Sequence, residues 1–314
     1  MKVTAIICTY NRWQTLRRAL ESVAASKLPA EWTWDALVVD NNSTDQTREV
    51  VAEFCRQDPE RFRYLFEARP GKSNALNAGI QHARGEILAF VDDDVTVEPT
   101  WLANLTAVFA DDSWAGAGGP ILPPVGFARP EWLSPTGKHL LAPFALFNPR
   151  PNPGELDEPP WGTNMAFRRS MFEKYGGFRA DLGPSPGSGV RNEDTEFGRR
   201  LLAAGERIFY APSAVVYHSV PEERLQQRYH LAWWSAHGRA DVREFGIPPG
   251  ICLFGIPLHL FGRVIILSFR WMLTLGPSRR FAFKRSLWCT FGAIKECFQQ
   301  SRRPNAQHKP NPCA

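Results

Sequence analysis

Three consecutive carboxylates, Asp92, Asp93 and Asp94, follow the apolar run from Ile87 to Val91. Adjacent carboxylates repel one another unless a metal ion or a basic group neutralises them. Hard oxygen ligands of this kind select Mg²⁺ or Mn²⁺, and these cations commonly bind together with phosphates. The run therefore predicts a metal and phosphate site, and the alternative is a solvated acidic loop.

Glu193 and Asp194 form a second acidic group later in the chain. A carboxylate in a binding crevice can act as a general base that takes a proton from a hydroxyl group. Acids are also common in the first turn of a helix, where they only complement the helix dipole. His218 ends another apolar run and could bind Mn²⁺ as neutral imidazole, although a lone histidine is more often structural.

The elements that must position these side chains alternate along the first part of the chain. Their spacing is typical of βαβ units and predicts a parallel sheet, whose carboxyl edge forms the usual ligand crevice. Helices that begin after residues 43–45 and 70–72 would present free N–H groups that suit phosphate. The predicted strands cover residues 3–8, 35–39, 62–66 and 87–91, and the predicted helices cover residues 13–26, 45–57 and 73–84.

Two large nucleotide-binding classes lack their phosphate-binding motifs in this chain. The first predicted strand is followed by residues 9–12, Thr-Tyr-Asn-Arg, and not by GxGxxG, which argues against a Rossmann oxidoreductase. The motifs GxxxxGKS and GxxxxGKT are also absent, which excludes the P-loop NTPases. Phosphate binding must therefore come from another arrangement.

Taken in order, six motifs resemble those of family 2 glycosyltransferases of the GT-A fold, over roughly residues 1 to 240. The resemblance implies an α/β fold with a Rossmann-like, mostly parallel central sheet flanked by helices. It also implies an inverting enzyme that moves a sugar from a nucleotide-diphosphate sugar, UDP- or GDP-linked, to an acceptor hydroxyl. The motifs are residues 6–12, 38–45, 71–77, 92–94, 162–168 and 192–197.

The resemblance assigns roles to individual residues. Asp194 would be the base that activates the acceptor. Asp94 would bind Mg²⁺ or Mn²⁺, with Asp92 at the metal or the ribose and His218 as a further ligand, as in some relatives. For Arg12 and Lys72 the alternative is an exposed charge at a helix start. The predicted nucleotide-sugar contacts are Thr9, Tyr10, Asn11, Arg12, Asp40, Lys72, Asn74, Asp92 and Asp93, and the predicted acceptor or donor-sugar contacts are Trp161, Gly162, Asn164 and Glu193.

A proline-rich stretch from residue 120 to 160 predicts a long loop that shapes the acceptor mouth. Trp132 and Trp161 could stack on sugar rings there, or they could anchor the core. We expect a lipid-linked or membrane-adjacent glycan as acceptor, as in the synthesis of cell-surface polysaccharides or glycolipids.

Two other functions fit parts of the sequence. A non-catalytic scaffold or binding protein could keep the fold, but the intact set of Asp92, Asp94 and Asp194 favours an enzyme. A processive polysaccharide synthase is the other alternative. Such synthases resemble a QxxRW pattern with several spanning helices, and residues 226–234 depart from that pattern.

The net charge of +5 is concentrated in the tail, where ten Lys and Arg from Arg263 onward oppose the single acid Glu296. The apolar neighbours of these charges favour an anionic membrane surface as partner, and not nucleic acid. Residues 251–275 are apolar but contain Arg263 and Arg270, so they fit an interfacial or re-entrant segment better than a spanning helix.

The apolar stripe between Phe281 and Phe298 predicts a second tail helix that lies on an anionic bilayer. The alternative is a helical hairpin packed on protein or in a dimer. We expect a catalytic domain at 1–245, a membrane-associated segment at 246–300 and a disordered tail at 301–314. The first residues lack a signal-peptide pattern, so the predicted location is the cytoplasmic face of a membrane, peripheral or monotopic. The apolar stripe consists of Phe281, Leu287, Trp288, Phe291, Ile294 and Phe298, with Lys284, Arg285 and Lys295 as the basic face.

Overall fold

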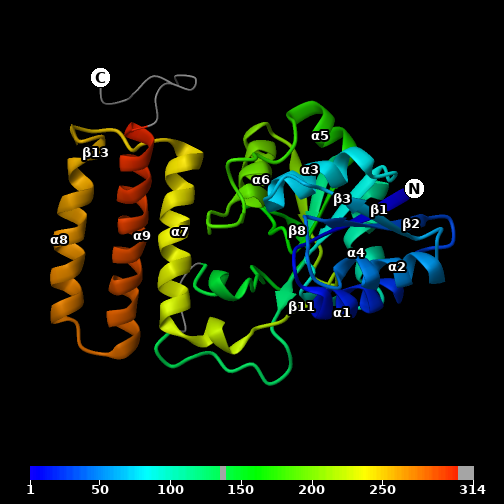
Figure 1. The fold of residues 1–314 in the computed structure, drawn as a ribbon, viewed down its shortest axis with the longest axis horizontal. Helices are drawn as coiled ribbons and strands as arrows, with labels where there is room; N and C mark the ends of the chain where they lie inside the picture. Colours follow the sequence, from blue (N-terminus) through cyan, green and yellow to red (C-terminus); the bar gives the residue numbers. More distant parts are fainter. Residues whose placement is uncertain (135–138, 303–314) are drawn as a thin grey trace. The chain divides into compact units, whose positions relative to one another are not determined.

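The computed structural model describes residues 1–134 and 139–302, which form two compact units (Figure 1). The sheet unit contains Met1–Val125, Ala145–Pro186 and Glu193–Ser219. The helical unit contains Gly126–Phe144, Gly187–Asn192 and the chain from Val220 onward. The two units therefore interleave in sequence, and the domain bounds expected at 245 and 300 stay predictions.

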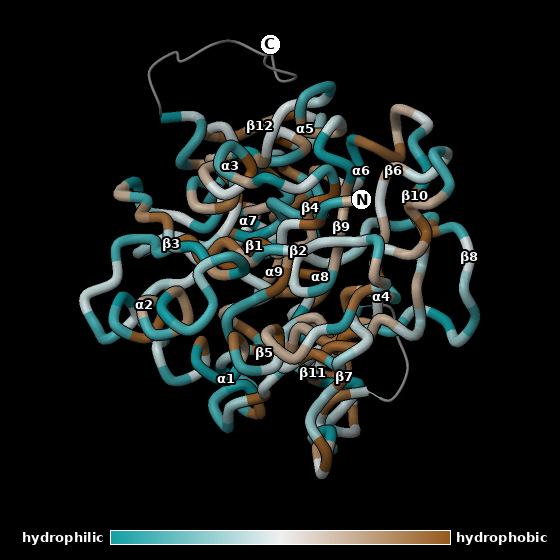
Figure 2. The backbone as a smooth tube through the Cα atoms, turned by 90° about the vertical axis from the view of Figure 1, so that its right-hand side faces the viewer, coloured by the Kyte–Doolittle hydropathy of each residue, from teal (hydrophilic) through white to brown (hydrophobic). Residues whose placement is uncertain are grey.

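The sheet unit is built on an eight-stranded sheet within the described residues, in the order β3-β2-β1-β4-β9-β6-β10-β8. β1 pairs in parallel with β2 and β4, and β2 pairs in parallel with β3. β9 is antiparallel to β4 and β6. Figure 2 shows β3 and β8 at opposite sides of this sheet. The strands are β1 (Lys2–Thr9), β2 (Thr33–Asp40), β3 (Phe62–Phe66), β4 (Ile87–Val91), β6 (Trp114–Gly118), β8 (Gly154–Glu155), β9 (Asn164–Arg168) and β10 (Arg207–Tyr210).

A smaller sheet continues from the end of β4. It contains β5 (Val95–Val97), β11 (Val216–His218) and β7 (Ile121–Leu122), with β11 in the middle. β11 is antiparallel to β5, and His218 lies opposite Val95. This pairing places His218 next to the residue that follows the three carboxylates.

The helices of the sheet unit follow from the apolar periodicity of the sequence. In α1 the buried residues Leu16, Ala19, Leu20 and Val23 recur at intervals of three and four, which gives one apolar face. All five residues of β4 are buried, as expected for a central strand covered on both faces. The predicted α/β class is thus confirmed. The first three predicted helices are also confirmed, and their ends lie within two residues of the predicted ends. The helices are α1 (Trp13–Ala24), α2 (Thr47–Gln57), α3 (Lys72–His82), α4 (Trp101–Thr106), η1 (Ala107–Ala110), α5 (Arg169–Tyr175) and α6 (Glu193–Ala203).

Asp45 fixes the beginnings of two helices at the carboxyl edge of the sheet. Its Oδ2 accepts a hydrogen bond from the backbone N–H of Trp13 at 3.2 Å, and its Oδ1 accepts one from the N–H of Thr47 at 3.0 Å. The first N–H groups of a helix have no partner within the helix, so one carboxylate stabilises both α1 and α2 here.

The helical unit consists mainly of three long helices, and α9 lies between α7 and α8 (Figure 1). Glu296 of α9 is fully buried and accepts hydrogen bonds from Arg239 at 3.2 Å and Arg243 at 2.8 Å, both on α7. Among the described residues, none of the helices has the length and hydropathy that a bilayer-crossing segment requires. The elements are η3 (Glu222–Leu225), α7 (Gln227–Phe245), β12 (Cys252–Leu253), β13 (Ile256–Pro257), α8 (Leu258–Leu273), α9 (Pro277–Ser301) and, earlier in the chain, η2 (Ala142–Phe144).

The apolar stripe predicted to lie on a bilayer packs largely on protein instead. Phe281 and Leu287 are buried, and Ile294 and Phe298 pack against a core cluster that includes Val242 of α7. The prediction is therefore wrong for these residues, because α7 and α8 already cover the apolar face of α9. The predicted disorder of 301–314 falls almost entirely on residues 303–314, which lie outside the described residues.

Two glycines allow α7 and α9 to approach closely. A Cβ atom at Gly238 of α7 would lie 2.0 Å from the carbonyl oxygen of Cys289 in α9. A Cβ atom at Gly292 of α9 would lie 1.9 Å from the carbonyl oxygen of Ser235 in α7. Both contacts are with backbone, so neither can be relieved by rotating a side chain.

We expect Gly292→Ala to lower the free energy of unfolding by about 1–3 kcal/mol or more, because the added methyl group forces α7 and α9 apart. The matched control is Gly262→Ala in α8, where an added Cβ meets no atom within 4 Å. That change should be neutral or stabilise by about 0.5–1 kcal/mol through helix propensity. Urea unfolding monitored by circular dichroism measures both; equal stability of the two variants would contradict the close packing.

Candidate active site

Asp92 lies just after β4 and uses both carboxylate oxygens. Its Oδ1 accepts a hydrogen bond from Lys72 Nζ at 2.6 Å, and its Oδ2 accepts one from Thr163 Oγ1 at 2.6 Å. Burial opposes ionisation of this carboxyl, but the ammonium of Lys72 and the hydroxyl of Thr163 outweigh it and keep the pKa of Asp92 below its usual value. The Asp92 carboxylate is therefore stabilised in its ionised form by Lys72 and Thr163, at the carboxyl edge of the sheet.

Asp93 and Asp94 share one positive partner. Nη1 of Arg12 lies 3.2 Å from Oδ1 of Asp93 and 3.1 Å from Oδ2 of Asp94. Burial and the neighbouring charge of Asp94 raise the pKa of Asp93 to about 7, in spite of the guanidinium. Asp94 also lies close to His218, whose Nε2 is 3.4 Å from Asp94 Oδ1. Two of the three carboxylates thus share one guanidinium.

This concentration of carboxylates fits a divalent cation. Asp94, which directly precedes β5, and His218 at the end of β11 offer one oxygen and one nitrogen donor, and β5 and β11 are neighbours in the small sheet. Within the described part of the chain, no three His, Cys, Asp or Glu side chains converge as a metal-binding group. Mg²⁺ is commonly held by one or two protein ligands together with substrate phosphates and water. The residues therefore fit a cation that binds together with a diphosphate.

The ammonium of Lys72 lies between the carboxylates that follow β4 and the second acidic group. Its ammonium lies 2.6 Å from Asp92 and 3.8 Å from Oε1 of Glu193, which is buried at the start of α6. Burial opposes the charge of Lys72, but Asp92 and Glu193 raise its pKa above the usual value. Lys72 is largely buried and paired with these acids, whereas Arg12 is 50% exposed at the start of α1 and also paired with acids, so the contacts of both with the nucleotide stay predictions.

Asp194 is held by backbone amides at the start of α6. Its Oδ2 accepts a hydrogen bond from the N–H of Gly162 at 2.6 Å, and its Oδ1 accepts one from the N–H of Thr195 at 2.7 Å. A Cβ atom at residue 162 would lie 2.9 Å from Asp194 Oδ2, so glycine permits this approach. The two amides fix the direction of the carboxylate, as a general base requires.

Consecutive residues tie the two acidic groups together. Gly162 binds Asp194 through its amide, and Thr163 binds Asp92 through its hydroxyl. Both lie immediately before β9, which is paired with β4. The pairing of β4 with β9 therefore sets the separation between Asp92, on the side of the predicted metal, and the predicted base Asp194.

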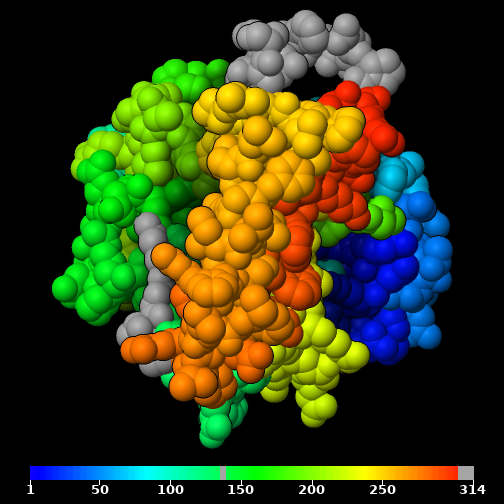
Figure 3. All heavy atoms as spheres, turned by 90° about the vertical axis from the view of Figure 1, so that its left-hand side faces the viewer, coloured from blue at the N-terminus to red at the C-terminus, as the bar shows by residue number. Residues whose placement is uncertain are grey.

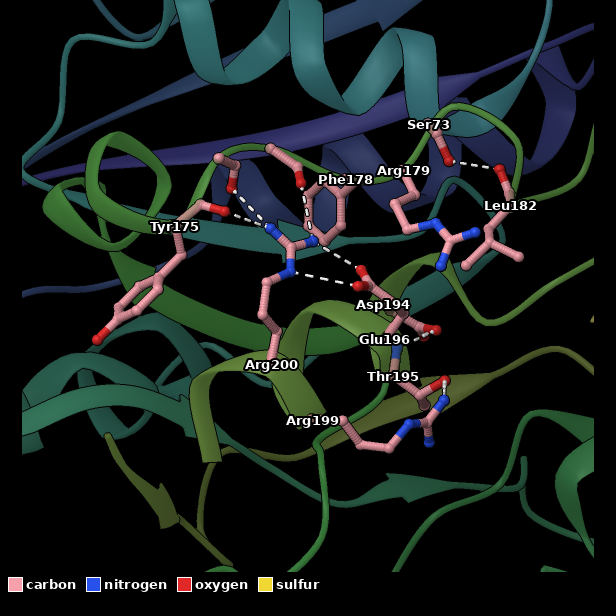
Figure 4. A network of polar contacts seen from close by, with 12 residues as sticks. Ser73, Tyr175, Phe178, Arg179, Leu182, Asp194, Thr195, Glu196, Arg199 and Arg200 are labelled. Atoms are coloured by element: carbon pink, nitrogen blue, oxygen red, sulfur yellow. Dashed lines mark hydrogen bonds and ion pairs between the residues drawn. The ribbon is translucent and has the colours of Figure 1, made fainter. Parts of the chain in front are cut away.

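Figure 4 shows how Arg200 anchors α6 to the segment at the end of α5. Arg200 donates to both carboxylate oxygens of Glu196, at 3.2 and 2.6 Å, and to the carbonyl oxygens that follow α5, including that of Gly177 at 3.1 Å. Phe197 stacks on Phe172 of α5 with ring centroids 4.4 Å apart. Glu196 is thus directed to Arg200 and Asp194 to Gly162, and the contacts of Arg200 and Phe197 support α6.

The loop after β1 is hydrogen-bonded to the loop after β2. Asn11 has a φ of 52°, and its Oδ1 accepts a hydrogen bond from the N–H of Thr44 at 2.7 Å. Its own N–H donates to Ser43 Oγ at 2.9 Å. Thr9 is buried at the end of β1, whereas Tyr10 is 47% exposed. These loops leave Tyr10 accessible, and the predicted nucleotide contacts of Thr9, Tyr10 and Asn11 stay predictions.

Asp40 ends β2 and is almost fully buried. Its Oδ1 accepts a hydrogen bond from the N–H of Ser43 at 2.9 Å, and its Oδ2 accepts one from the hydroxyl of Tyr64 at 2.8 Å. Asp40 therefore shapes the loop beside the site, and each oxygen keeps a second lone pair for a ligand. Its contact with the nucleobase stays a prediction.

Three other predicted contacts have framework partners. Asn164 is fully buried, and its amide binds the indole N–H of Trp101 and the carbonyl oxygens of Pro120 and Ala214. The ring of Trp161 lies 5.0 Å from that of Phe147. Asn74 donates to the carbonyl oxygen of Pro70 at 2.9 Å. This geometry favours structural roles, and the contacts of Asn164, Trp161 and Asn74 with substrate stay predictions.

Trp132 belongs to the core of the helical unit. Its ring lies 4.9 Å from that of His230 and 4.4 Å from that of Phe281. His230 is fully buried, and burial lowers its pKa to about 4. The structure therefore favours the core-anchor alternative for Trp132.

Two residues of the site were not singled out from the sequence. Thr163 binds Asp92, and Asn41 organises the loop before α3 by accepting from the N–H of Gly71 at 2.8 Å and donating to Glu67 and Arg69. Gly71 has a φ of 118°, which suits glycine. Both residues lie inside the resembling motifs, and for Thr163 its position next to Gly162 was the available signal.

Known proteins resemble the chain over most of its length. The sequence profile described as Glycosyl transferase family 2 matches residues 4–176. The chain is 30% identical over 228 residues to the succinoglycan biosynthesis protein ExoM of Rhizobium meliloti (strain 1021), covering 72% of this chain and 68% of that protein. It is 28% identical over 233 residues to glucosyl-dolichyl phosphate glucuronosyltransferase of Haloferax volcanii, covering 72% of each.

Solved structures agree in fold. The mannosyltransferase PcManGT from Pyrobaculum calidifontis, in complex with GDP-Man and Mn²⁺, has a TM-score of 0.65 and 21% sequence identity, covering 95% of this chain and 87% of that one. This similarity confirms the predicted GT-A fold. Since the family profile also spans more than half of the sequence, the chain belongs to glycosyl transferase family 2.

Proposed function

We propose that this glycosyltransferase moves a sugar, with inversion, from a UDP- or GDP-linked donor to a hydroxyl group of a lipid-linked or membrane-adjacent glycan. The observation that supports it most directly is the pair Gly162 and Thr163, which binds the predicted base Asp194 and the donor-side carboxylate Asp92 together. The names of the two relatives, in succinoglycan biosynthesis and in transfer to a dolichyl phosphate sugar, support a polysaccharide or glycolipid product.

The donor side must stabilise the diphosphate that leaves. Asp94 and His218 would hold Mg²⁺ or Mn²⁺, which supplies positive charge to the departing diphosphate when bound. Arg12 and Lys72 are the cationic side chains beside the same carboxylates. The Mn²⁺ present in the complex of the mannosyltransferase supports a divalent metal and does not decide between Mg²⁺ and Mn²⁺.

The acceptor side needs a group that takes the hydroxyl proton. In our proposal the Asp194 carboxylate, fixed by the amides of Gly162 and Thr195, accepts that proton as the hydroxyl oxygen attacks the anomeric carbon. Attack occurs on the face opposite the diphosphate, which inverts the configuration. Glu193 pairs with Lys72 and would hold the donor and acceptor sides in register.

We also propose that the helical unit binds the cytoplasmic face of an anionic membrane through α8. α8 presents a series of large apolar side chains to its outer surface, and Figure 3 shows that surface. Arg263, Arg270, Arg279 and Arg280 are exposed on or next to α8. Glu296, the single acid from Arg263 onward, is buried against two arginines, so this surface is positive and suits anionic lipid. The exposed apolar side chains of α8 are Leu258, Phe261, Ile265, Ile266, Phe269, Met272 and Leu273.

The first prediction concerns the metal. Asp94→Asn should remove most of the increase in nucleotide affinity that Mn²⁺ provides, because the amide carries no charge to hold the cation. Calorimetry with UDP and with GDP, each with and without Mn²⁺, measures this increase. Asp112→Asn, with a side chain 98% exposed, serves as control and should behave as wild type. If wild-type protein binds both nucleotides equally well with and without Mn²⁺, the metal role is wrong.

The second prediction separates chemistry from binding. Asp194→Asn should lower kcat by a factor on the order of 10² to 10⁴, with nucleotide affinity nearly unchanged, because the amide cannot take a proton. The amide oxygen can still accept from the Gly162 N–H, so the fold should persist. Transfer and donor hydrolysis over a panel of nucleotide sugars give kcat, and thermal unfolding checks the fold. Wild-type turnover in the variant would exclude Asp194 as base.

The third prediction concerns the membrane. Replacing Phe269 and Met272 by Ser should weaken binding to anionic liposomes about tenfold or more, because both side chains would leave the lipid interface. The matched control replaces Phe66 and Val125, exposed apolar residues of the sheet unit. Binding of the wild type should weaken with salt without vanishing, since salt screens only the basic charges. Flotation measures this; wild-type protein that fails to float with every lipid mixture would rule out the membrane role.

A further inference from the structure

Arg12 bridges the two carboxylates that the proposed cation would also neutralise. A single nitrogen, Nη1, contacts Asp93 at 3.2 Å and Asp94 at 3.1 Å. The two acids are mostly buried, with exposed side-chain fractions of 6% and 12%, whereas the Arg12 side chain is 50% exposed. The cationic group is therefore placed between fixed anions by a side chain that solvent reaches.

The surroundings of Arg12 at the start of α1 decide which other anions its guanidinium could bind. Arg12 lies immediately before α1, with a φ of −143°, and the first turn of α1 contains no acidic residue. Asp45, whose carboxylate binds the N–H of the next residue, Trp13, is also bonded to Thr47. Once displaced from Asp93 and Asp94, the guanidinium would thus need an anion supplied from outside the chain.

We infer that Arg12 makes metal binding depend on the nucleotide diphosphate. Without nucleotide, the guanidinium neutralises Asp93 and Asp94, and a divalent cation must displace it at the cost of leaving Arg12 unpaired. With nucleotide bound, the diphosphate provides the guanidinium with a new anionic partner, and the carboxylates become available to the cation. The inference rests on the proposed metal-dependent transfer and adds a role for Arg12 as a positioning residue.

Coupling of this kind is reciprocal. If a nucleotide raises the affinity for Mn²⁺ by some factor, Mn²⁺ must raise the affinity for the nucleotide by the same factor. Removing the guanidinium should therefore lower both effects together. A purely structural role of Arg12 at the start of α1 would change stability and leave this factor unaltered.

The test is the dissociation constant of Mn²⁺, measured by electron paramagnetic resonance of free Mn²⁺, without nucleotide and with saturating UDP or GDP. Wild-type protein should bind Mn²⁺ weakly alone and more tightly with the matching nucleotide. Arg12→Gln should bind Mn²⁺ alone about fivefold or more tightly than wild type, and the nucleotide should add correspondingly less. Arg12→Lys keeps the charge and should restore part of the wild-type coupling.

Arg17→Gln is the matched control, since Arg17 also lies on α1 and pairs with Glu53 at 2.7 Å, away from the carboxylates. It should leave both dissociation constants unchanged. Mn²⁺ affinity without nucleotide that is equal or weaker in Arg12→Gln, with unchanged coupling, would overturn the inference while the metal role stands. Absence of Mn²⁺ binding by the wild type under every condition would overturn the proposed metal role and the inference with it.

Discussion

The mutual repulsion of carboxylates at the end of β4 is the constraint on which the site depends. Asp92, Asp93 and Asp94 are consecutive, and their partners are Lys72 from α3, Arg12 from the start of α1, which Asp93 and Asp94 share, and His218 from β11. Each partner comes from a separate part of the sheet unit. The repulsion between the three carboxylates is therefore offset only when the loop after β1, the loop after β3 and the small sheet have all folded.

The same arrangement explains how the two sides of the proposed reaction stay in register. Asp194 lies on α6, far along the chain from β4, but its carboxylate is bonded to Gly162, next to the residue that binds Asp92. Arg200 and Phe197 fix the outer part of α6 to the end of α5. If Asp194 acts as the proposed base, a carboxylate held this firmly would need little rearrangement when an acceptor arrives, which favours efficient proton transfer.

Local patterns were sufficient to predict the first half of the sheet unit. The strands up to Val91 and the helices α1 to α3 follow from alternation and helix-start residues, since each depends on neighbours in sequence. The antiparallel insertion of β9 beside β4, and the interleaving of residues 126–144 with the tail, depend on contacts between distant segments and had no local signal. The stripe of α9 shows the limit clearly, because an apolar helix face is equally suited to lipid and to another helix. Burial of Phe281 could only be learned from its neighbours.

The pairing of β4 with β9 has a consequence for the synthesis of the chain. β4 is complete at Val91, whereas its second neighbour begins at Asn164. As the chain emerges from the ribosome, the sheet of β1 to β4 can form first, with one entirely apolar strand left as an open edge. Such an edge is a template for pairing with other chains. Until β9 pairs with β4, this apolar edge is the part of the nascent chain most open to pairing with another chain.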